Sequence, residues 1–221
     1  MARGTAASPR WYYAVEEAYA ALCGLGLTVI MYNRRKGGRP VVKKWQIIER
    51  RLVVDNPWLQ VYEDDMLTGT GVRVDGYYTV RKRDFAAVVP LTSDGQVLLI
   101  REYKHAVGEV VWSLPAGIVD QGEDAATAAA RELHEETGYV AASLEHLGTW
   151  VVSDAFVADK AHLFVAYDVQ ASGAAQLEAS EEIECQLMPF AEAIRAVEAG
   201  GLFSGVGLVA ALLLAARRVG L

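Results

Sequence analysis

The sequence predicts an α/β protein with a mixed sheet. Three observations carry this expectation. Runs of strand-forming residues recur between residues 44 and 189, an alanine-rich helical segment interrupts them at 123–137, and two further helical segments follow towards the C-terminus. At 221 residues, the chain is long enough to bury a sizeable core in one domain with a small appended unit.

A small antiparallel β unit is expected at residues 44–84. The runs KWQIIERRLVVD and WLQVYEDD are rich in strand formers, and Asn56-Pro57 separates them. The run VRVDGYYTVRKR predicts two short strands joined by a turn at Asp75-Gly76. Pieces of two or three strands are marginal alone, so this unit is expected to pack against a partner subunit.

The next segments predict a hairpin and then a helix. Residues 85–105 contain two strand-like runs around the turn-forming pair Asp94-Gly95. Residues 123–137 are alanine-rich and helical in pattern, and Gly138 suits the left-handed position that ends a helix.

The last third of the chain returns to strands and closes with helices. LEHLGTWVVS (144–153) and KAHLFVAYDV (160–169) are strand-like. Residues 189–201 begin with proline and end in glycine, as helices often do. The apolar run at 207–218 predicts a buried terminal helix.

We therefore divide the chain into an extension of uncertain structure (1–43), the β unit (44–84) and a main domain (85–221). Within the extension, AYAALCGLGLTVIMY (18–32) is apolar but short for a membrane span. A signal anchor and a loosely packed extension both remain open for it.

Charge and cysteine content narrow the classes of partner. The formal net charge of −7 disfavours nucleic acid, which is bound by neutralising phosphates with Lys and Arg. Cys23 and Cys185 form neither a metal-ligand spacing nor a disulfide framework. We expect a cytoplasmic protein with neither nucleic-acid nor membrane partners.

Acidic residues crowd one face of the predicted helix at 123–137. Glu132 and Glu136 are four residues apart, and Glu135 lies beside both. Like charges at this spacing repel, so solvent or a cation must stabilise them. A hard divalent cation such as Mg²⁺ takes oxygen ligands of this kind. Arg131 is expected to pair with Glu123 and to hold the preceding loop against the helix.

The spacing of these residues resembles the Nudix box in every polar position. Tyr139, where the family usually has an aliphatic residue, is a mild departure. The matching residues are Gly117, Glu123, Arg131, Glu132, Glu135, Glu136 and Gly138.

This resemblance implies an α/β/α sandwich around a mixed sheet, and hydrolysis of a nucleoside diphosphate linked to another moiety. It implies Mg²⁺ as cofactor, with Mn²⁺ as an alternative. Glu132 and Glu136 resemble the principal metal ligands, and Glu135 a third ligand or a supporting catalytic residue. The backbone carbonyl of Ala116 resembles a further ligand.

Residues 44–218 are similar to the ADP-ribose pyrophosphatase branch of this family. That similarity implies a homodimer in which the N-terminal strands pack across the partner and help to bind the base. Tyr77 or Tyr78 is then the expected stacking residue. Lys104 would face the diphosphate as a point charge.

A general base is expected in the later acidic loop, with Glu181 the better match and Glu182 the second. Two departures from the branch bear on specificity. Asp154 stands where a proline is common, and Ser113 where glutamate is usual. Asp154 is therefore expected to contact the substrate, which is ADP-ribose or a nucleotide sugar. The alternative to an enzyme is a Nudix module that binds such a ligand without hydrolysing it.

Overall fold

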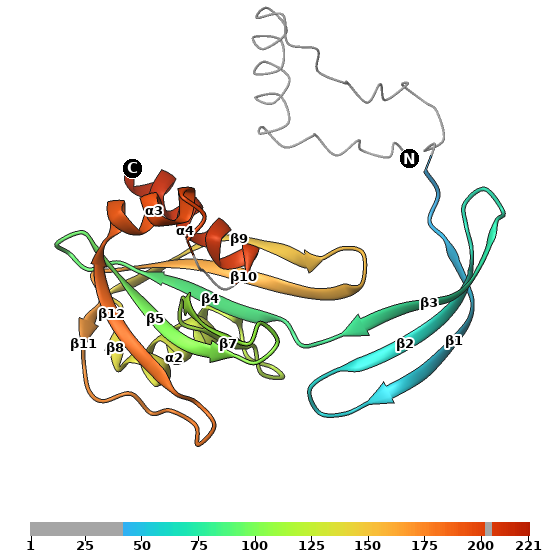
Figure 1. Cartoon of the computed structure of the whole chain (residues 1–221), viewed down its shortest axis with the longest axis horizontal. Helices are drawn as coiled ribbons and strands as arrows, with labels where there is room; N and C mark the ends of the chain where they lie inside the picture. Colours follow the sequence, from blue (N-terminus) through green and yellow to red (C-terminus); the bar gives the residue numbers. More distant parts are fainter. Residues whose placement is uncertain (1–41, 202–204) are drawn as a thin grey trace, which may run out of the picture. The chain divides into compact units, whose positions relative to one another are not determined.

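A seven-stranded mixed sheet confirms the predicted α/β class. The protein is described by a computed structural model that covers residues 42–201 and 205–221, so the expectations for residues 1–41 lie outside it. The strands are β1 (Gln46–Asp55), β2 (Gln60–Leu67), β3 (Arg73–Arg81), β4 (Phe85–Pro90), β7 (Ala116–Ile118), β9 (Ser143–Ser153) and β10 (Val157–Tyr167). Their order is β1-β2-β3-β10-β4-β7, with β9 beside β10 (Figure 1). β10 runs parallel to β3 and β4, while the other neighbours are antiparallel.

A second sheet contains β12 (Ile183–Pro189), β5 (Gln96–Lys104) and β6 (Glu109–Ser113), in that order. The hairpin predicted at residues 85–105 is therefore wrong beyond its turn. Gly95 adopts the expected left-handed conformation, but β4 and β5 share only the bridge between Leu91 and Val97. The physical reason is that both edges of each strand are already paired, β4 with β10 and β7, and β5 with β12 and β6. A short sheet of β8 (Tyr139–Val140) and β11 (Gln170–Ala171) completes the strands.

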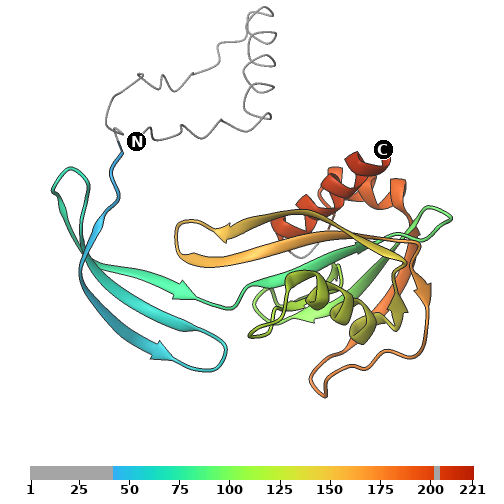
Figure 2. The same ribbon diagram turned by 180° about the vertical axis from the view of Figure 1, so that it is seen from behind.

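The predicted acidic helix is α2 (Ala125–Thr137), which covers one face of the main sheet (Figures 1 and 2). Asp124 caps its first turn by accepting hydrogen bonds from two backbone N–H groups, and Gly138 ends it at φ 73° as expected. Its inward side is made of small or apolar residues, including Ala128, Ala129 and Leu133, which pack on β4 and β10. This packing fixes which side of the helix presents its carboxylates.

Two helices, α3 (Phe190–Glu198) and α4 (Val206–Val219), cover the opposite face. Alanines and leucines of α4, such as Ala211 and Leu212, are fully buried against β4 and β10, which confirms the predicted buried terminal helix. The sandwich of helix, sheet and helix is thus present. None of the helices in the described part of the chain is long and apolar enough to cross a membrane.

The segment 72–83 forms one strand, β3, and not the two predicted short strands. Gly76 has φ 67°, but this left-handed residue makes a bulge and not a turn. Its N–H donates to the Asp65 carboxylate at 2.9 Å, at the point where the β2–β3 register shifts. A turn residue was correctly identified, but its neighbours continue in the same direction because β2 pairs with them on both sides of the bulge.

An ion pair on the β1–β2 ladder should contribute measurably to stability. Both carboxylate oxygens of Asp64, which is 1% exposed, accept from Arg50 at 2.6–2.7 Å. Asp64→Asn leaves a guanidinium without its charged partner, so we expect the free energy of unfolding to fall by about 1–3 kcal/mol. Urea unfolding measures this.

Asp75→Asn is the matched control, because Asp75 pairs with Arg73 on the exposed side of the same unit. Its effect should stay within about 0.5 kcal/mol. Equal effects of the two substitutions would contradict the importance given to the buried pair.

Candidate functional site

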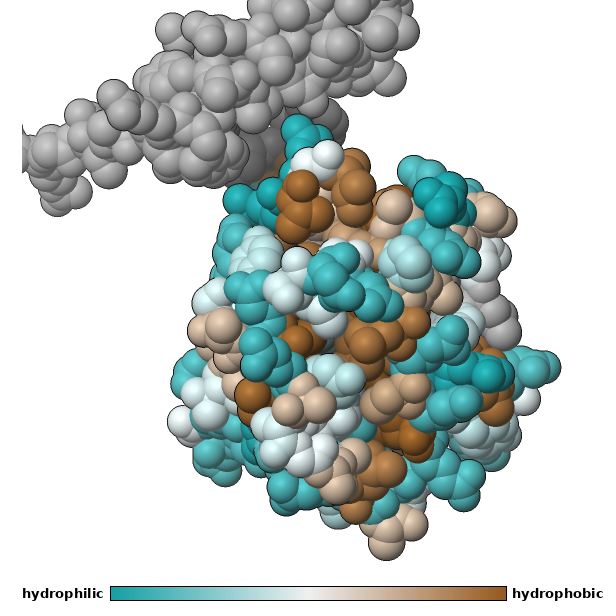
Figure 3. Space-filling model, turned by 90° about the vertical axis from the view of Figure 1, so that its left-hand side faces the viewer, coloured by the Kyte–Doolittle hydropathy of each residue, from teal (hydrophilic) through white to brown (hydrophobic). Residues whose placement is uncertain are grey.

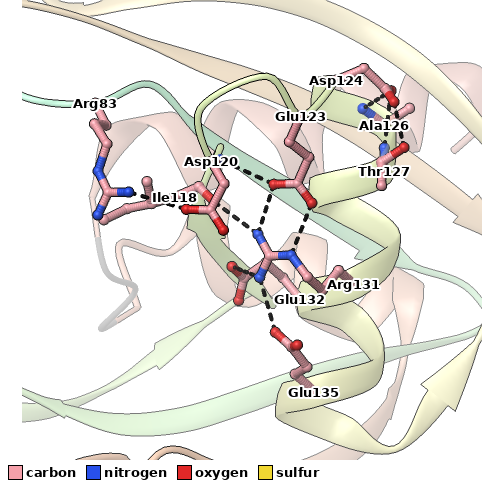
Figure 4. Close-up of polar contacts among 10 residues, drawn as sticks. All are labelled: Arg83, Ile118, Asp120, Glu123, Asp124, Ala126, Thr127, Arg131, Glu132 and Glu135. Atoms are coloured by element: carbon pink, nitrogen blue, oxygen red, sulfur yellow. Dashed lines mark hydrogen bonds and ion pairs between the residues drawn. The ribbon is translucent and has the colours of Figure 1, made fainter.

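Arg131 of α2 is hydrogen-bonded through all five of its N–H groups (Figure 4). Nε and Nη2 donate to the two carboxylate oxygens of Glu123 at 2.9 and 3.0 Å, and Nη2 also donates to the carbonyl of Ile118 at 3.0 Å. Nη1 donates to Glu132 at 2.7 Å and to Glu135 at 2.9 Å. One guanidinium therefore ties the loop before α2 to two acidic residues of the helix.

The loop before α2 is ordered by Glu123. Besides its two bonds from Arg131, the Glu123 carboxylate accepts the backbone N–H of Asp120 at 3.0 Å. The hydrogen bonds from Arg131 are the main reason that the pKa of Glu123 is held below its usual range. The pairing of Arg131 with Glu123 expected from the sequence is present.

Glu136 lies deeper than the other acidic residues of the helix. It is 6% exposed, whereas the Glu135 side chain is 42% exposed. Burial is the main reason that the pKa of Glu136 is raised to about 9, and the nearby charges of Glu132, Glu102 and Glu181 contribute in the same direction. The backbone N–H of Ala116 donates to its carboxylate at 3.0 Å and opposes this shift. Burial also raises the pKa of Glu132.

Gly117 leaves the space in which the Glu132 carboxylate lies. A Cβ at this position would come within 2.1–2.4 Å of the carboxylate atoms of Glu132. The sequence pattern places a glycine here, and the structure supplies the reason: any side chain on residue 117 would force the Glu132 carboxylate to move.

A cavity of about 270 Å³ is lined by further carboxylates. Glu181 and Glu182, the two candidates for a general base, line it from the loop before β12. Glu102 of β5 also lines it, and the charges of Glu181 and Glu102 both raise the pKa of Glu136. Glu102 was missed by the sequence analysis, although it stands two residues before Lys104 on the same strand. The lining residues are Glu102, Tyr103, Ser180, Glu181, Glu182 and Ile183.

The arrangement fits a divalent cation in its donor chemistry. Buried Glu136 shares its surroundings with three other carboxylates, which is costly without a compensating positive charge. In the part of the chain that the structure describes, no three acidic, His or Cys side chains are already gathered as a ligand set. Arg131 instead binds the carboxylates of Glu132 and Glu135. Mg²⁺ needs few protein ligands because it retains several waters.

The other predicted site residues lie outside this cluster. The Lys104 ammonium pairs with Glu102 at 2.7 Å. Tyr77 donates its hydroxyl hydrogen to the carbonyl of Ala155, whereas Tyr78 is 50% exposed. Asp154 is exposed in the turn between β9 and β10 and is not among the residues that line the acidic cavity.

A second cavity, of about 380 Å³, lies between the β1–β2 turn and the end of β3. It combines the basic residues 81–83 with Trp58, which is 70% exposed. A lone tryptophan after a turn carries no sequence signal of its exposure, so Trp58 does not stand out in the sequence.

The chain was compared with known proteins. A family model described as "NUDIX domain" matches residues 81–203. A CMP-5'-(N-acetyl-N-hydroxy-3-aminopropyl)phosphonate hydrolase of Streptomyces rubellomurinus is 30% identical over 178 residues, which cover 79% of this chain and 85% of that protein. An ADP-ribose pyrophosphatase of Bacillus subtilis is 24% identical over 152 residues, which cover 68% of this chain and 82% of that protein.

A solved structure shows the same fold. The crystal structure of an ADP compounds hydrolase superposes with a TM-score of 0.71 at 24% identity, over 82% of this chain and 97% of that one. Together with the sequence matches, this likeness agrees with the family and the fold expected from the sequence.

The close approach at Gly117 leads to a specific expectation. In Gly117→Ala the new methyl must displace the Glu132 carboxylate, which is the end of a flexible side chain, so the fold should tolerate it. Affinity for a divalent cation, measured by titration calorimetry, should fall roughly 10-fold. Gly173→Ala is the control, because a Cβ there meets nothing within 4 Å. Unchanged affinity in Gly117→Ala would exclude Glu132 from the cation site.

Proposed function

Since the chain belongs to the NUDIX domain family and is a hydrolase of its ADP-ribose pyrophosphatase branch, we propose that it cleaves the diphosphate bond of ADP-ribose or of a nucleotide sugar with Mg²⁺. The products are a nucleoside monophosphate and a sugar phosphate. The observation that carries the proposal is the convergence of carboxylates from three elements, α2, β5 and the loop before β12, around the buried Glu136.

Glu132 and Glu136 are the proposed ligands of the cation, with Glu135 and the Ala116 carbonyl in support. When bound, the cation would neutralise the diphosphate and lower the pKa of the attacking water. Glu181 is the first candidate for the general base. Its carboxylate is held by the backbone N–H of Glu178 at 2.8 Å, and its charge acts on Glu132 and Glu136. Glu182, on the same cavity wall, is the second candidate.

Groups outside the acidic cluster are proposed to hold the rest of the substrate. Lys104 offers a positive charge to the diphosphate from β5. Tyr78 is free to stack on a base, whereas the Tyr77 ring already stacks on Phe156 at a centroid distance of 6.4 Å. Asp154, in the β9–β10 turn, is proposed to accept hydrogen bonds from sugar hydroxyls of the substrate.

We also propose a homodimer. Figure 3 shows one face of the molecule, on which apolar residues lie among polar ones, as on most protein surfaces. Strand β1 differs, because nine of its ten positions are exposed although it carries many apolar residues. A three-stranded edge exposed in this way gains stability by burying that surface against a second copy. The exposed apolar residues of β1 are Ile47, Ile48, Leu52, Val53 and Val54.

Substitution of the box carboxylates tests the catalytic assignment. Glu132→Gln and Glu136→Gln each remove a charge from a site whose action is electrostatic, so turnover should fall at least ~10²-fold. The fold should be little affected, because both substitutions relieve like-charge repulsion. Near-full activity of both variants would disprove the assignment.

The substrate panel for that experiment is ADP-ribose, GDP-mannose, UDP-glucose, CDP-glucose, ATP and dGTP at fixed Mg²⁺, repeated with Mn²⁺. We expect ADP-ribose and the nucleotide hexoses to fall within ~10-fold of each other in kcat/KM. Triphosphates should be poor substrates, because their additional charge meets Asp154. A clear preference for a triphosphate would overturn the proposed substrate class.

Light scattering at micromolar concentration tests the dimer. The wild-type protein should have twice the mass of one chain, and Leu52→Asp should be a monomer because it places a charge on the exposed strand. Val206→Asp is the control, since Val206 is equally apolar and 86% exposed but lies at the start of α4. A monomeric, fully active wild-type protein would contradict the proposal.

A further inference from the structure

Strand β5 carries Glu102 and Lys104 on one face, because residues two apart in a strand point to the same side. The same face includes Ile100, whose register partner on β12 is Cys185. The Cys185 thiol lies 3.8 Å from the backbone carbonyl of Glu136 and donates to it. This face of β5 is therefore turned towards the last turns of α2.

Glu102 and Lys104 differ in depth. The Glu102 side chain is 17% exposed and lines the acidic cavity, whereas the Lys104 side chain is 43% exposed. Their ion pair measures 2.7 Å between Nζ and Oε2. Glu102, a lining residue of the cavity, thus holds an ammonium that is more exposed than its own carboxylate.

Lys104 has another carboxylate within reach of its backbone position. Its register partner on β6 is Glu109. Among the residues that the structure describes, however, the ion pair of Lys104 is with Glu102 alone. The ammonium is directed along its own strand towards the cavity and not across the hairpin.

We propose that Glu102 is a positioning residue that holds the Lys104 ammonium at the rim of the acidic cavity, where it meets the diphosphate of the substrate. This inference rests on the proposed function. Lysine has a long, flexible side chain and loses rotamer freedom when it binds a phosphate. A residue that orders it beforehand removes part of that cost from binding.

The ion pair also explains how Glu102 is tolerated. A fourth carboxylate beside Glu136 adds repulsion at the most buried acid of the site. The ammonium 2.7 Å away offsets the charge of Glu102. Removing either member of the pair leaves the other charge without its partner. The effects of substituting Glu102 and Lys104 on substrate binding should therefore be coupled.

A double-mutant cycle tests the coupling. The probe is α,β-methylene ADP, a nucleoside diphosphate that is not hydrolysed, titrated by calorimetry at fixed Mg²⁺ into the full chain. Glu102→Gln and Lys104→Met should each weaken binding roughly 5-fold, and KM for ADP-ribose should rise alike while kcat changes less than ~2-fold. The double variant should bind no more weakly than Lys104→Met alone.

Glu109→Gln is the matched control. It removes the same charge from the register partner of Lys104 and should leave binding within ~2-fold of the wild type. Independent effects that multiply in the double variant would overturn the proposal. So would a Glu102→Gln variant that loses kcat at unchanged affinity, or a Glu109→Gln variant as weak as Glu102→Gln.

Failure of the proposed function gives a different result. A wild-type protein that neither hydrolyses the diphosphates of the panel nor binds α,β-methylene ADP would disprove the function itself. A wild-type protein that does both, with no coupling between Glu102 and Lys104, would disprove only the positioning role.

Discussion

The guanidinium of Arg131 is the interaction on which the site depends. Its five N–H groups bind one carbonyl and three carboxylates, so that no donor is left for solvent. The partners come from β7, from the loop that follows it and from α2 itself. Because the guanidinium is planar and its donors are fixed in direction, these partners are held in direction as well. Lysine could not replace it.

Around this anchor, the helix separates its acidic residues by depth. Ala128 and Ala129 are fully buried, and these small side chains allow α2 to lie close to the sheet. Glu136, near the inner side, is desolvated, while Glu135 stays half exposed and is bound by Arg131. Carboxylates of one sequence cluster therefore lie in different surroundings. A cation bound here would offset the cost of keeping that buried carboxylate charged.

The sequence predicted correctly the features that depend only on the spacing of residues within one short segment. The pairing of Arg131 with Glu123 and the left-handed Gly138 follow from spacing along one helix. The predicted hairpin at residues 85–105 was wrong because the pairing of β4 and β5 depends on which other strands pair with their edges. The sequence of residues 85–105 does not contain that information. Gly76 was read as a turn because a bulge and a turn need the same left-handed residue. Glu102 was missed for a related reason. Its significance comes from a helix more than thirty residues away.

Residues that are close in sequence and residues that are distant in sequence therefore have different proposed roles in the site. The residues proposed to hold the cation lie in β7 and α2, which are close in sequence, so that spacing largely fixes their relation. Those proposed to meet the substrate come from β3, β5, the β9–β10 turn and the loop before β12, which only the fold brings into relation. Glu102 belongs to both groups, since it acts on Glu136 through its charge and on Lys104 through an ion pair. A change in β5 can therefore alter both substrate affinity and the charge around Glu136. The spacing of the acidic residues around Arg131 does not depend on the sequence of β5. Substrate preference can therefore vary in this fold while the arrangement around Arg131 stays the same.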